Sequence, residues 1–521
     1  MATTKKDIEA VLWRAADTFR GTIDAANYKD YVLSMLFVKY LSDTYEERVE
    51  EIKEKYSDPI RQERAIVRLP FMMKEEHTFK WLYNNRFKEN LGELINIALR
   101  GIEDDNPSQL SGVFRSVDFN SEAMLGRHEQ RNPRLRELLE DFAPLNLHPS
   151  QITVDEGKVV ADTLGDAYEY MIGQFASEAG KKAGNFFTPP EVSELMARLV
   201  SPKINERIYD PTCGSASLLI KAAKKADNKV SIFGQEMNGS SWSMARMNMF
   251  IHNINDARIA WGDTLASPQH LDSDGNLMQF DVIVANMPFS QDKWAAGFNP
   301  GGETSGSKVK EFKMDAALDK YHRFDWGVPP ASKGDWAFLL HMIASLKSGG
   351  RMAAVVPHGV LFRGASEGRI RQTVIEKNLL DTVIGLPVNL FYGTSIPACI
   401  IIFQKNRNRN DVLFIDASGK DGSGNLRYKK DKNQNKLEPQ NINDIVNVFL
   451  ARTEMERFAH VASLDEIRSN EYNLNIPRYV DTFEEENLVD IEEVKINMAN
   501  LQKELAEVET KMAKYLEELG L

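Results

Sequence analysis

Four strand-like segments that lead to polar residues at nearly equal spacing limit the fold of this chain most strongly. The polar residues are Asp210, Glu236, Asp263 and Asn286, and successive members are 26, 27 and 23 residues apart. Each interval accommodates one strand, one covering helix and two short connections. The pattern therefore predicts an α/β fold with a parallel sheet, whose strand carboxyl ends meet at one ligand-binding edge.

The length of 521 residues predicts more than one domain. Residues 1–155 show helical periodicity and are expected to form an all-helical domain, residues 156–480 to hold the sheet, and residues 481–521 to form a final helix. In that last segment apolar residues alternate at intervals of 3 and 4: Ile491, Val494, Met498, Leu501, Leu505, Val508, Met512, Tyr515 and Leu519. Such a heptad seam predicts a coiled coil with a partner helix, or packing against the amino-terminal helices of the same chain.

Charge and composition narrow the class of protein. The chain has 64 basic and 76 acidic residues and a formal net charge of -12. This charge argues against a protein that binds nucleic acid on its own through a broad basic surface. No apolar run reaches about 18 residues and no signal peptide is evident, so a cytoplasmic location without membrane contact is expected. Cys213 and Cys399 are too few and too far apart for a disulfide framework or a metal site, and both are interpreted as packing residues.

The loop after the first strand, residues 211–217, consists mainly of small residues and leads into an apolar helix. Such a turn lets a ligand approach the backbone and the free amides of the helix. The loop lacks the glycine pattern of a dinucleotide site and the lysine of a P-loop, so phosphate binding is disfavoured. Asp210 suits a ligand with an ammonium group, and Glu236 is placed to accept both hydroxyls of a ribose.

The fourth strand is followed by Asn286, Met287, Pro288 and Phe289. A carboxamide, a carbonyl oriented by proline and an aromatic ring are suited to hold the amino group of a flat base. Taken alone, the four residues are better explained as an ordinary turn. The preceding series of acidic residues at strand ends favours a ligand-binding site instead. The following segment, 291–334, has no clear periodicity and is expected to be a long mobile loop over the crevice.

In their order along the chain, these motifs resemble those of the modification subunits of type I restriction-modification systems, which are S-adenosylmethionine-dependent adenine-N6 DNA methyltransferases. The resemblance rests on NFFTPP at 185–190, DPTCGSAS at 210–217, Glu236, Asp263 and NMPF at 286–289, and it extends to the helical amino-terminal part and the coiled-coil tail. It implies a Rossmann-like methyltransferase sheet, and site-specific methylation of DNA.

The resemblance also implies roles for individual residues. S-adenosylmethionine would be held by Asn185, Phe186, Phe187, Thr188, Pro189, Pro190, Asp210, Gly214, Ser215, Ala216, Ser217, Glu236 and Asp263. Asp263 would approach the adenine ring of the cofactor. Asn286, Met287, Pro288 and Phe289 would receive a target adenine flipped out of the duplex, with Phe289 stacked on it. Neither a covalent intermediate nor a metal ion is implied.

Two residues depart from the family pattern. Met287 replaces a proline, and Ala216 stands where glycine is common. Pro288 still biases Met287 to the extended region and so still aims its carbonyl, but the stiffness of the loop is in question. Two alternatives therefore stay open: a methyltransferase for another planar amino group, on an RNA base or a protein glutamine, and a catalytically impaired cofactor-binding scaffold.

The partners implied by the resemblance are double-stranded DNA, a specificity subunit that reads the DNA sequence, and a restriction subunit. The family pattern further implies two modification subunits for each specificity subunit. The heptad seam near the carboxyl terminus is the candidate contact for the specificity subunit.

Overall fold

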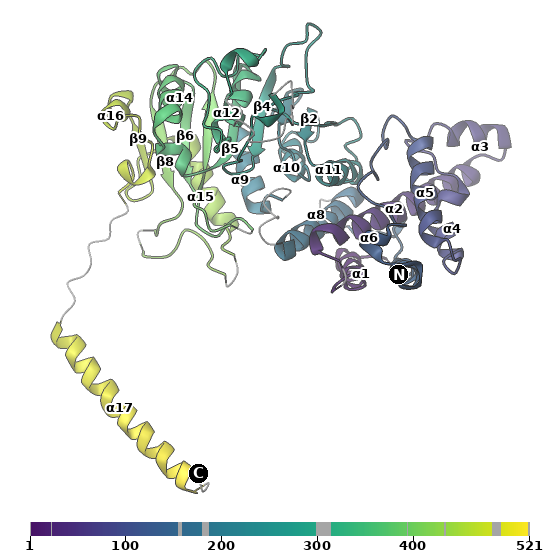
Figure 1. Cartoon of the computed structure of the whole chain (residues 1–521), viewed down its shortest axis with the longest axis horizontal. Coiled ribbons are helices and arrows are strands. Elements are labelled where there is room, and N and C mark those ends of the chain that lie inside the picture. Colours follow the sequence, from purple (N-terminus) through teal and green to yellow (C-terminus); the bar gives the residue numbers. More distant parts are fainter. Residues whose placement is uncertain are drawn as a thin grey trace, which may run out of the picture. The chain divides into compact units, whose positions relative to one another are not determined.

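The structure of the chain is a computed structural model that describes residues 2–21, 23–154, 159–179, 187–298, 314–392, 394–421, 423–431, 434–481 and 491–518. The chain divides into two compact units, residues 1–480 and 481–521. Figure 1 shows helices at the amino-terminal end of the first unit and a mixed sheet with covering helices in the rest of that unit. Among the described residues, no helix is both long and apolar enough to span a lipid bilayer.

The described residues form a nine-stranded sheet with the order β3-β2-β1-β4-β5-β7-β6-β8-β9. The strands β1 to β5 are mutually parallel, β7 runs antiparallel to β5 and β6, and β9 runs antiparallel to β8. This confirms the predicted α/β fold, and a helix follows β1 and β2 as expected. The expectation of a helix between β3 and β4 is wrong, because residues 262–279 form turns and an isolated bridge. The strand bounds are β1 Arg207–Asp210, β2 Ser231–Glu236, β3 Arg258–Trp261, β4 Phe280–Asn286, β5 Leu346–Pro357, β6 Leu380–Gly385, β7 Ala398–Gln404, β8 Val412–Asp416 and β9 Ala459–Ala462.

Both faces of the sheet are buried, as the apolar sequence of β4 requires. Val282 and Val284 belong to the hydrophobic cluster on one face, whereas Ile283 and Ala285 belong to the cluster on the other, because successive side chains of a strand alternate. The first face is covered by α9 Pro190–Val200, α10 Ser217–Lys224 and α15 Pro439–Ala451. The second is covered by α12 Asp335–Ala344, α13 Gly359–Phe362, α14 Ala365–Glu376 and α16 Leu464–Ser469.

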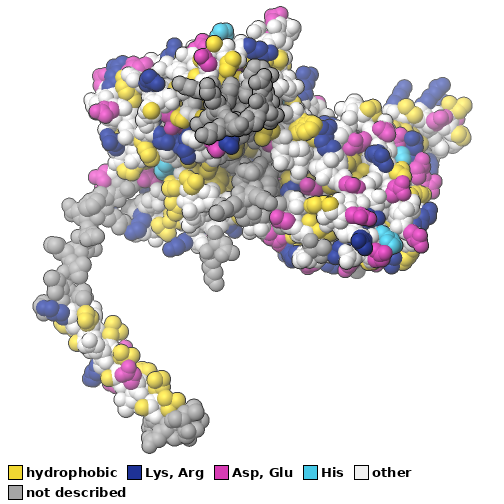
Figure 2. All heavy atoms as spheres, in the orientation of Figure 1, with side chains coloured by type: hydrophobic (Ala, Val, Ile, Leu, Met, Phe, Trp, Pro, Cys, Tyr) yellow, Lys and Arg dark blue, Asp and Glu magenta, His cyan; other side chains and the backbone are white. Residues whose placement is uncertain are grey.

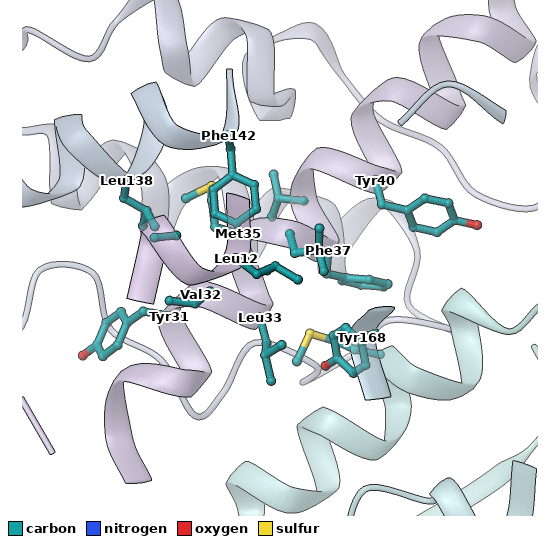
Figure 3. Packing of buried hydrophobic residues seen from close by; sticks show 14 of the residues in the cluster. Leu12, Tyr31, Val32, Leu33, Met35, Phe37, Tyr40, Leu138, Phe142 and Tyr168 are labelled. Atoms are coloured by element: carbon teal, nitrogen blue, oxygen red, sulfur yellow. The ribbon is translucent and has the colours of Figure 1, made fainter. Parts of the chain in front are cut away.

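The amino-terminal part is helical, as predicted, and its core surrounds α2. Figure 3 shows Val32, Leu33, Met35 and Phe37 of this helix among side chains of the neighbouring helices. Residues 31–44 of α2 are buried all round, which explains their apolar sequence without a helical stripe. The helices are α1 Lys5–Asp17, α2 Ala25–Lys55, α3 Pro59–Ile66, α4 Phe79–Asn84, α5 Leu91–Asp105, α6 Glu122–Leu125, α7 His128–Phe142 and α8 Val160–Ala179.

The helical core continues into the sheet region through α11 Gly239–Ile251. Met244, Met247, Phe250 and Ile251 of this helix belong to the same hydrophobic cluster as α1, α2 and α8. At the start of α11, the hydroxyl of Ser240 donates a hydrogen bond of 2.8 Å to Asp30 of α2. The helical part therefore packs on the helix that directly follows β2 and Glu236.

The segment expected to be a mobile loop contains several residues that pack in the core. Residues 299–313 lie outside the described residues, but Trp294 and Phe324 on either side of them are buried and their ring centroids are 5.2 Å apart. The buried guanidinium of Arg323 pairs with Asp319 at 2.7 Å and donates to the carbonyls of Thr264 at 3.4 Å and Leu265 at 2.6 Å. The expectation of a mobile loop is thus wrong around Trp294, Asp319, Arg323 and Phe324, because aromatic packing and a buried ion pair hold these residues without any periodic pattern.

The second unit contains α17 Ile491–Glu518, a single helix of 28 residues. Its predicted seam is exposed at Met498, Leu501, Leu505, Val508, Met512 and Tyr515, each with more than half of its side chain accessible. Figure 2 shows hydrophobic side chains along this helix. The side chains of Ile491 and Val494 and all of Leu519 lie outside the described part of the chain. An apolar stripe of this extent is typical of a helix that packs against another helix.

The stack of Phe280 on Tyr209 tests the importance of the core beneath β1 and β4. The two ring centroids are 4.4 Å apart with an interplanar angle of 21°, and both side chains are buried. Phe280→Ala should lower the free energy of unfolding by about 3–5 kcal/mol, because it removes a buried aromatic ring and leaves a cavity. Phe362→Ala, at a half-exposed position on the same side of the sheet, should cost less than about 1 kcal/mol. Equal denaturation midpoints for the two variants would contradict this assignment of the core.

Candidate active site

The predicted polar strand ends lie at one edge of the sheet. β1 pairs directly with β2 and with β4, so that Asp210, Glu236 and Asn286 end three adjacent parallel strands. A cavity of about 500 Å³ at this edge is lined by Glu236, Asp263, Asn286, Pro288 and Phe289, among others. A smaller cavity of about 20 Å³ is lined by Asp210, Gly214, Ser215, Ser217 and Thr188, among others, and also by Asn286. Asn286 therefore forms part of the wall of both cavities.

The loop after β1 turns sharply into α10 through two residues in the left-handed region. Gly214 has φ +54° and Ala216 has φ +64°. Glycine adopts this region freely, whereas a side chain there costs roughly 1 kcal/mol. Ala216 is fully buried, and its N–H donates to the carbonyl of Cys213 at 2.7 Å. The departure from glycine at Ala216 is thus accommodated with some backbone strain.

The carboxylate of Glu236 connects two loops of the site. Oε2 accepts from the N–H of Gly214 at 2.9 Å, and Oε1 accepts from the N–H of Asn238 at 2.7 Å. Burial raises the pKa of this carboxyl group. Each oxygen of a carboxylate can accept a second hydrogen bond, so Glu236 retains acceptor capacity for hydroxyl groups in the larger cavity.

Asp210 is nearly inaccessible to solvent, and its Oδ1 accepts from the N–H of Thr212 at 2.9 Å. Burial, and to a smaller extent the charge of Glu236, raise the pKa of Asp210 to about 8. A buried carboxyl group of this kind is stabilised in its ionised form when a cationic group binds beside it. Asp210 therefore suits a single ammonium group, and the smaller cavity beside it has room for about one group of that size.

Asp263 is half-buried and caps the turn that follows β3. Its Oδ1 accepts from the N–H of Leu265 at 2.9 Å and from the N–H of Ala266 at 3.2 Å. The residue lines the larger cavity beside Leu265. The arrangement gives that cavity both a carboxylate and an adjacent apolar side chain.

The four residues after β4 have different surroundings. The side-chain amide of Asn286 donates to Oγ1 of Thr188 at 3.1 Å, which leaves its Oδ1 to accept from a ligand. Met287 is buried in the hydrophobic cluster on the α12 face of the sheet and lines neither cavity. The ring of Phe289 lines the larger cavity and packs edge-on against Phe391, with centroids 5.9 Å apart.

The other predicted site residues are distributed around this centre. Phe187 reaches the smaller cavity, but Pro189 and Pro190 line a separate cavity of about 440 Å³ next to α8. Asn185 and Phe186 lie outside the described residues. Cys213 and Cys399 are buried thiols, as the interpretation of both as packing residues requires.

Several residues of the larger cavity were missed by sequence reasoning, notably Met237, Asn238, Ser290 and Phe338. Asn238 could have been found, because an asparagine before glycine at a strand end is a typical helix N-cap, and its side chain does accept from the N–H of Ser241. Ser290 and Phe338 carry no comparable local signal.

The raised pKa of Asp210 predicts how its contribution to stability depends on pH. In the unfolded chain an aspartate titrates near about 3.9, so the folded state holds the proton more tightly. The stabilisation is fully present below that pH and is lost as the pH rises towards 8. Asp210→Asn removes the titration, so its melting temperature relative to the unsubstituted protein should increase steadily from pH 5 to pH 8 in the absence of ligands.

The control for this measurement is Asp274→Asn, in an exposed turn between β3 and β4. Its melting temperature should differ from that of the unsubstituted protein by the same amount at every pH in this range. A constant difference for Asp210→Asn as well would contradict the pKa assigned to Asp210.

Comparisons with known proteins agree with this arrangement. The family described as "N-6 DNA Methylase" matches residues 159–488, and the family described as "HsdM N-terminal domain" matches residues 8–142. The MpnII methylase subunit of a type I restriction enzyme from Mycoplasma pneumoniae is 32% identical over 99% of this chain and 96% of its own length. The corresponding MjaVIII subunit from Methanocaldococcus jannaschii is 31% identical over 99% of this chain and 85% of its own length.

A solved structure agrees with these sequence matches. The methyltransferase subunit of a type I restriction-modification system from Streptococcus thermophilus superimposes with a TM-score of 0.76 at 36% identity, over 92% of this chain and 100% of the other. The matches cover both the helical part and the sheet, including the edge where the four polar strand ends meet. The chain therefore belongs to the N-6 DNA methylase family and, within it, to the methylase subunits of type I restriction enzymes.

Proposed function

We propose that this adenine-N6 DNA methyltransferase carries out methyl transfer at the junction of the two cavities beside β1 and β4. The observation that carries the proposal is the position of Asn286, which lines both cavities and keeps its side-chain oxygen available. An acceptor at this position can hold the amino group of a base close to a ligand that extends along both cavities. Proximity and orientation would then supply most of the rate.

The residues of the site fit S-adenosylmethionine as the cofactor. Asp210, with its raised pKa, would face the ammonium group, and the loop of Gly214, Ser215, Ala216 and Ser217 would enclose the methionine part. Glu236 would accept the ribose hydroxyls, and Asp263 with Leu265 would border the adenine ring. When bound, the cofactor supplies an electrophilic methyl group on a sulfonium centre.

The target adenine would be held by the chain's own residues after it leaves the duplex. Its amino nitrogen is a weak nucleophile because the lone pair is delocalised into the ring. Hydrogen bonds from the amino group to Oδ1 of Asn286 and to the carbonyl of Met287 would favour a pyramidal nitrogen. Phe289 would stack on the base, and Thr188 would keep the amide of Asn286 in the required orientation.

Three further expectations remain part of the proposal. The domain boundary near residue 155 lies between the two family matches, and the boundary near residue 480 is supported by the separate unit that begins at residue 481. The helix α8, just after the first boundary, packs in the core of the amino-terminal helices. Double-stranded DNA, a specificity subunit and a restriction subunit are proposed as partners, with two methylase subunits for each specificity subunit. Basic and acidic side chains are interspersed on the face shown in Figure 2, which is consistent with DNA binding that depends on such partners.

Substitution of Asn286 tests the catalytic proposal. Asn286→Ala should reduce methyl transfer from labelled S-adenosylmethionine to duplex DNA at least about 100-fold, because it removes a polar contact to the reacting group. Cofactor binding measured by calorimetry should remain. Asn276→Ala, in the turn before β4 and outside both cavities, is the matched control and should keep full activity. Equal labelling by the two variants would exclude the proposed role of Asn286.

The exposed seam of α17 tests the proposed contact with the specificity subunit. Leu501→Gln combined with Val508→Gln should abolish co-purification with that subunit, because both side chains belong to the apolar stripe and are more than half exposed. Lys503→Gln combined with Thr510→Gln, which changes the other side of the helix, should leave assembly unchanged. Removal of residues 481–521 should leave the melting temperature and cofactor binding of the first unit intact. Full-yield co-purification of the seam variant would refute this surface as the contact.

A further inference from the structure

The turn directly after the proposed catalytic residues is held in an unfavourable backbone conformation. Ser290 has φ +50°, in the left-handed region that residues other than glycine rarely adopt. Such a conformation persists only where neighbouring groups stabilise it. The backbone conformation of Ser290 is stabilised by contacts with residues far along the chain.

The carboxylate of Asp335, in the first turn of α12, accepts both donors of Ser290. Its Oδ1 accepts from the backbone N–H at 2.7 Å, and its Oδ2 accepts from the hydroxyl at 3.3 Å. Asp335 is completely buried. The neighbouring backbone adds a second link, because the N–H of Gly334 donates to the carbonyl of Gln291 at 3.0 Å. The start of α12 therefore holds the Ser290 turn at two successive residues.

Arg363, which follows α13, completes the contact. Its Nη2 donates to Oδ2 of Asp335 at 2.5 Å, and its Nη1 lies 3.5 Å from the hydroxyl of Ser290. The Nε atom of Arg363 is 2.9 Å from the buried carboxylate of Glu367. The guanidinium compensates the charge of the buried Asp335 carboxylate, and Glu367 forms a second ion pair with it.

This arrangement bears on Met287, which replaces a proline in the catalytic loop. A proline at that position would restrict the backbone of the loop directly. Here Pro288 restricts Met287 from one side, and the next fixed point along the chain is Ser290. The Met287 carbonyl lies directly before Pro288, and the Phe289 ring lies between Pro288 and Ser290; these are the groups that would hold and stack on the target base.

We propose that Asp335 is a positioning residue for methyl transfer: by holding the Ser290 turn, it provides the loop stiffness that a proline at position 287 would otherwise provide. The inference rests on the proposed function, since it takes residues 286–289 as the site for the base. It assigns to Asp335 no contact with substrate or cofactor. Its effect should therefore appear in the rate of transfer and not in cofactor binding.

The test uses the full chain in complex with its specificity subunit and a duplex that carries the target site, identified by mapping modified adenines in host DNA. Asp335→Ala should lower kcat about 10-fold while the Kd for S-adenosylmethionine changes less than about 2-fold, because loss of orientation affects the reacting geometry. Asp335→Asn keeps the shape and one acceptor for the Ser290 N–H, and it should lower kcat about 3-fold. If the alanine variant does not fold, the asparagine variant decides. Unchanged kcat in the folded variants, or equal losses of kcat and cofactor affinity, would overturn the proposal.

Asp281→Asn is the matched control. Asp281 lies at the opposite end of β4 and, like Asp335, accepts from one backbone N–H, that of Arg207 at 3.0 Å, and from one cation, Lys347 at 2.7 Å. It should reduce the melting temperature without reducing kcat. A loss of kcat in proportion to the loss of stability in both variants would show that Asp335 is merely structural.

A second substitution separates stiffness from other effects. Met287→Pro should raise kcat more in the Asp335→Ala background than in the unsubstituted protein, because only there is the external restraint missing. The same change in both backgrounds would overturn the proposed link. Asn286→Ala in the same assay distinguishes the two proposals: if it remains active, the proposed function fails, whereas an inactive Asn286→Ala beside a fully active Asp335→Ala overturns only this inference.

Discussion

The arrangement of the candidate active site depends on the hydrogen bonds that the Glu236 carboxylate accepts. One carboxylate accepts from the loop after β1, at Gly214, and from the start of α11, at Asn238. It can do so only because β1 and β2 are adjacent and parallel, which brings the ends of both strands to the same edge. The geometry of the loop after β1 is therefore a consequence of the strand order, and the Glu236 carboxylate links this loop to the start of α11.

Much of the fold and part of the site could be predicted from the sequence, because the patterns that indicate them involve residues close together in the chain. Asp210, Glu236 and Asn286 each follow an apolar strand, so their positions in the sheet follow from one repeated unit. The amino-terminal helices and the heptad pattern of α17 likewise depend on side chains a few residues apart. The short strand β9 was not predicted, since its four residues include the polar His460 and give only a weak alternating pattern.

The features that sequence reasoning missed depend on residues far apart in the chain. Ser290 and Asp335 are 45 residues apart, and Arg323 reaches carbonyls 58 and 59 residues earlier. No periodic pattern in the sequence indicates such contacts. A segment rich in glycine, serine and charged residues was therefore expected to be a mobile loop. The aromatic residues Trp294, Phe298 and Phe324 were the available signal that the segment packs, because their rings contact one another.

The sharing of α11 between two hydrophobic cores has a consequence for the modularity of this protein. One part of the helix completes the core of the amino-terminal helices, and its first residues follow the strand that ends in Glu236. An exchange of the helical part for one from another methylase would have to preserve the surface formed by Met244, Met247, Phe250 and Ile251. The two domains are thus matched to each other through this helix, and they would have to diverge together.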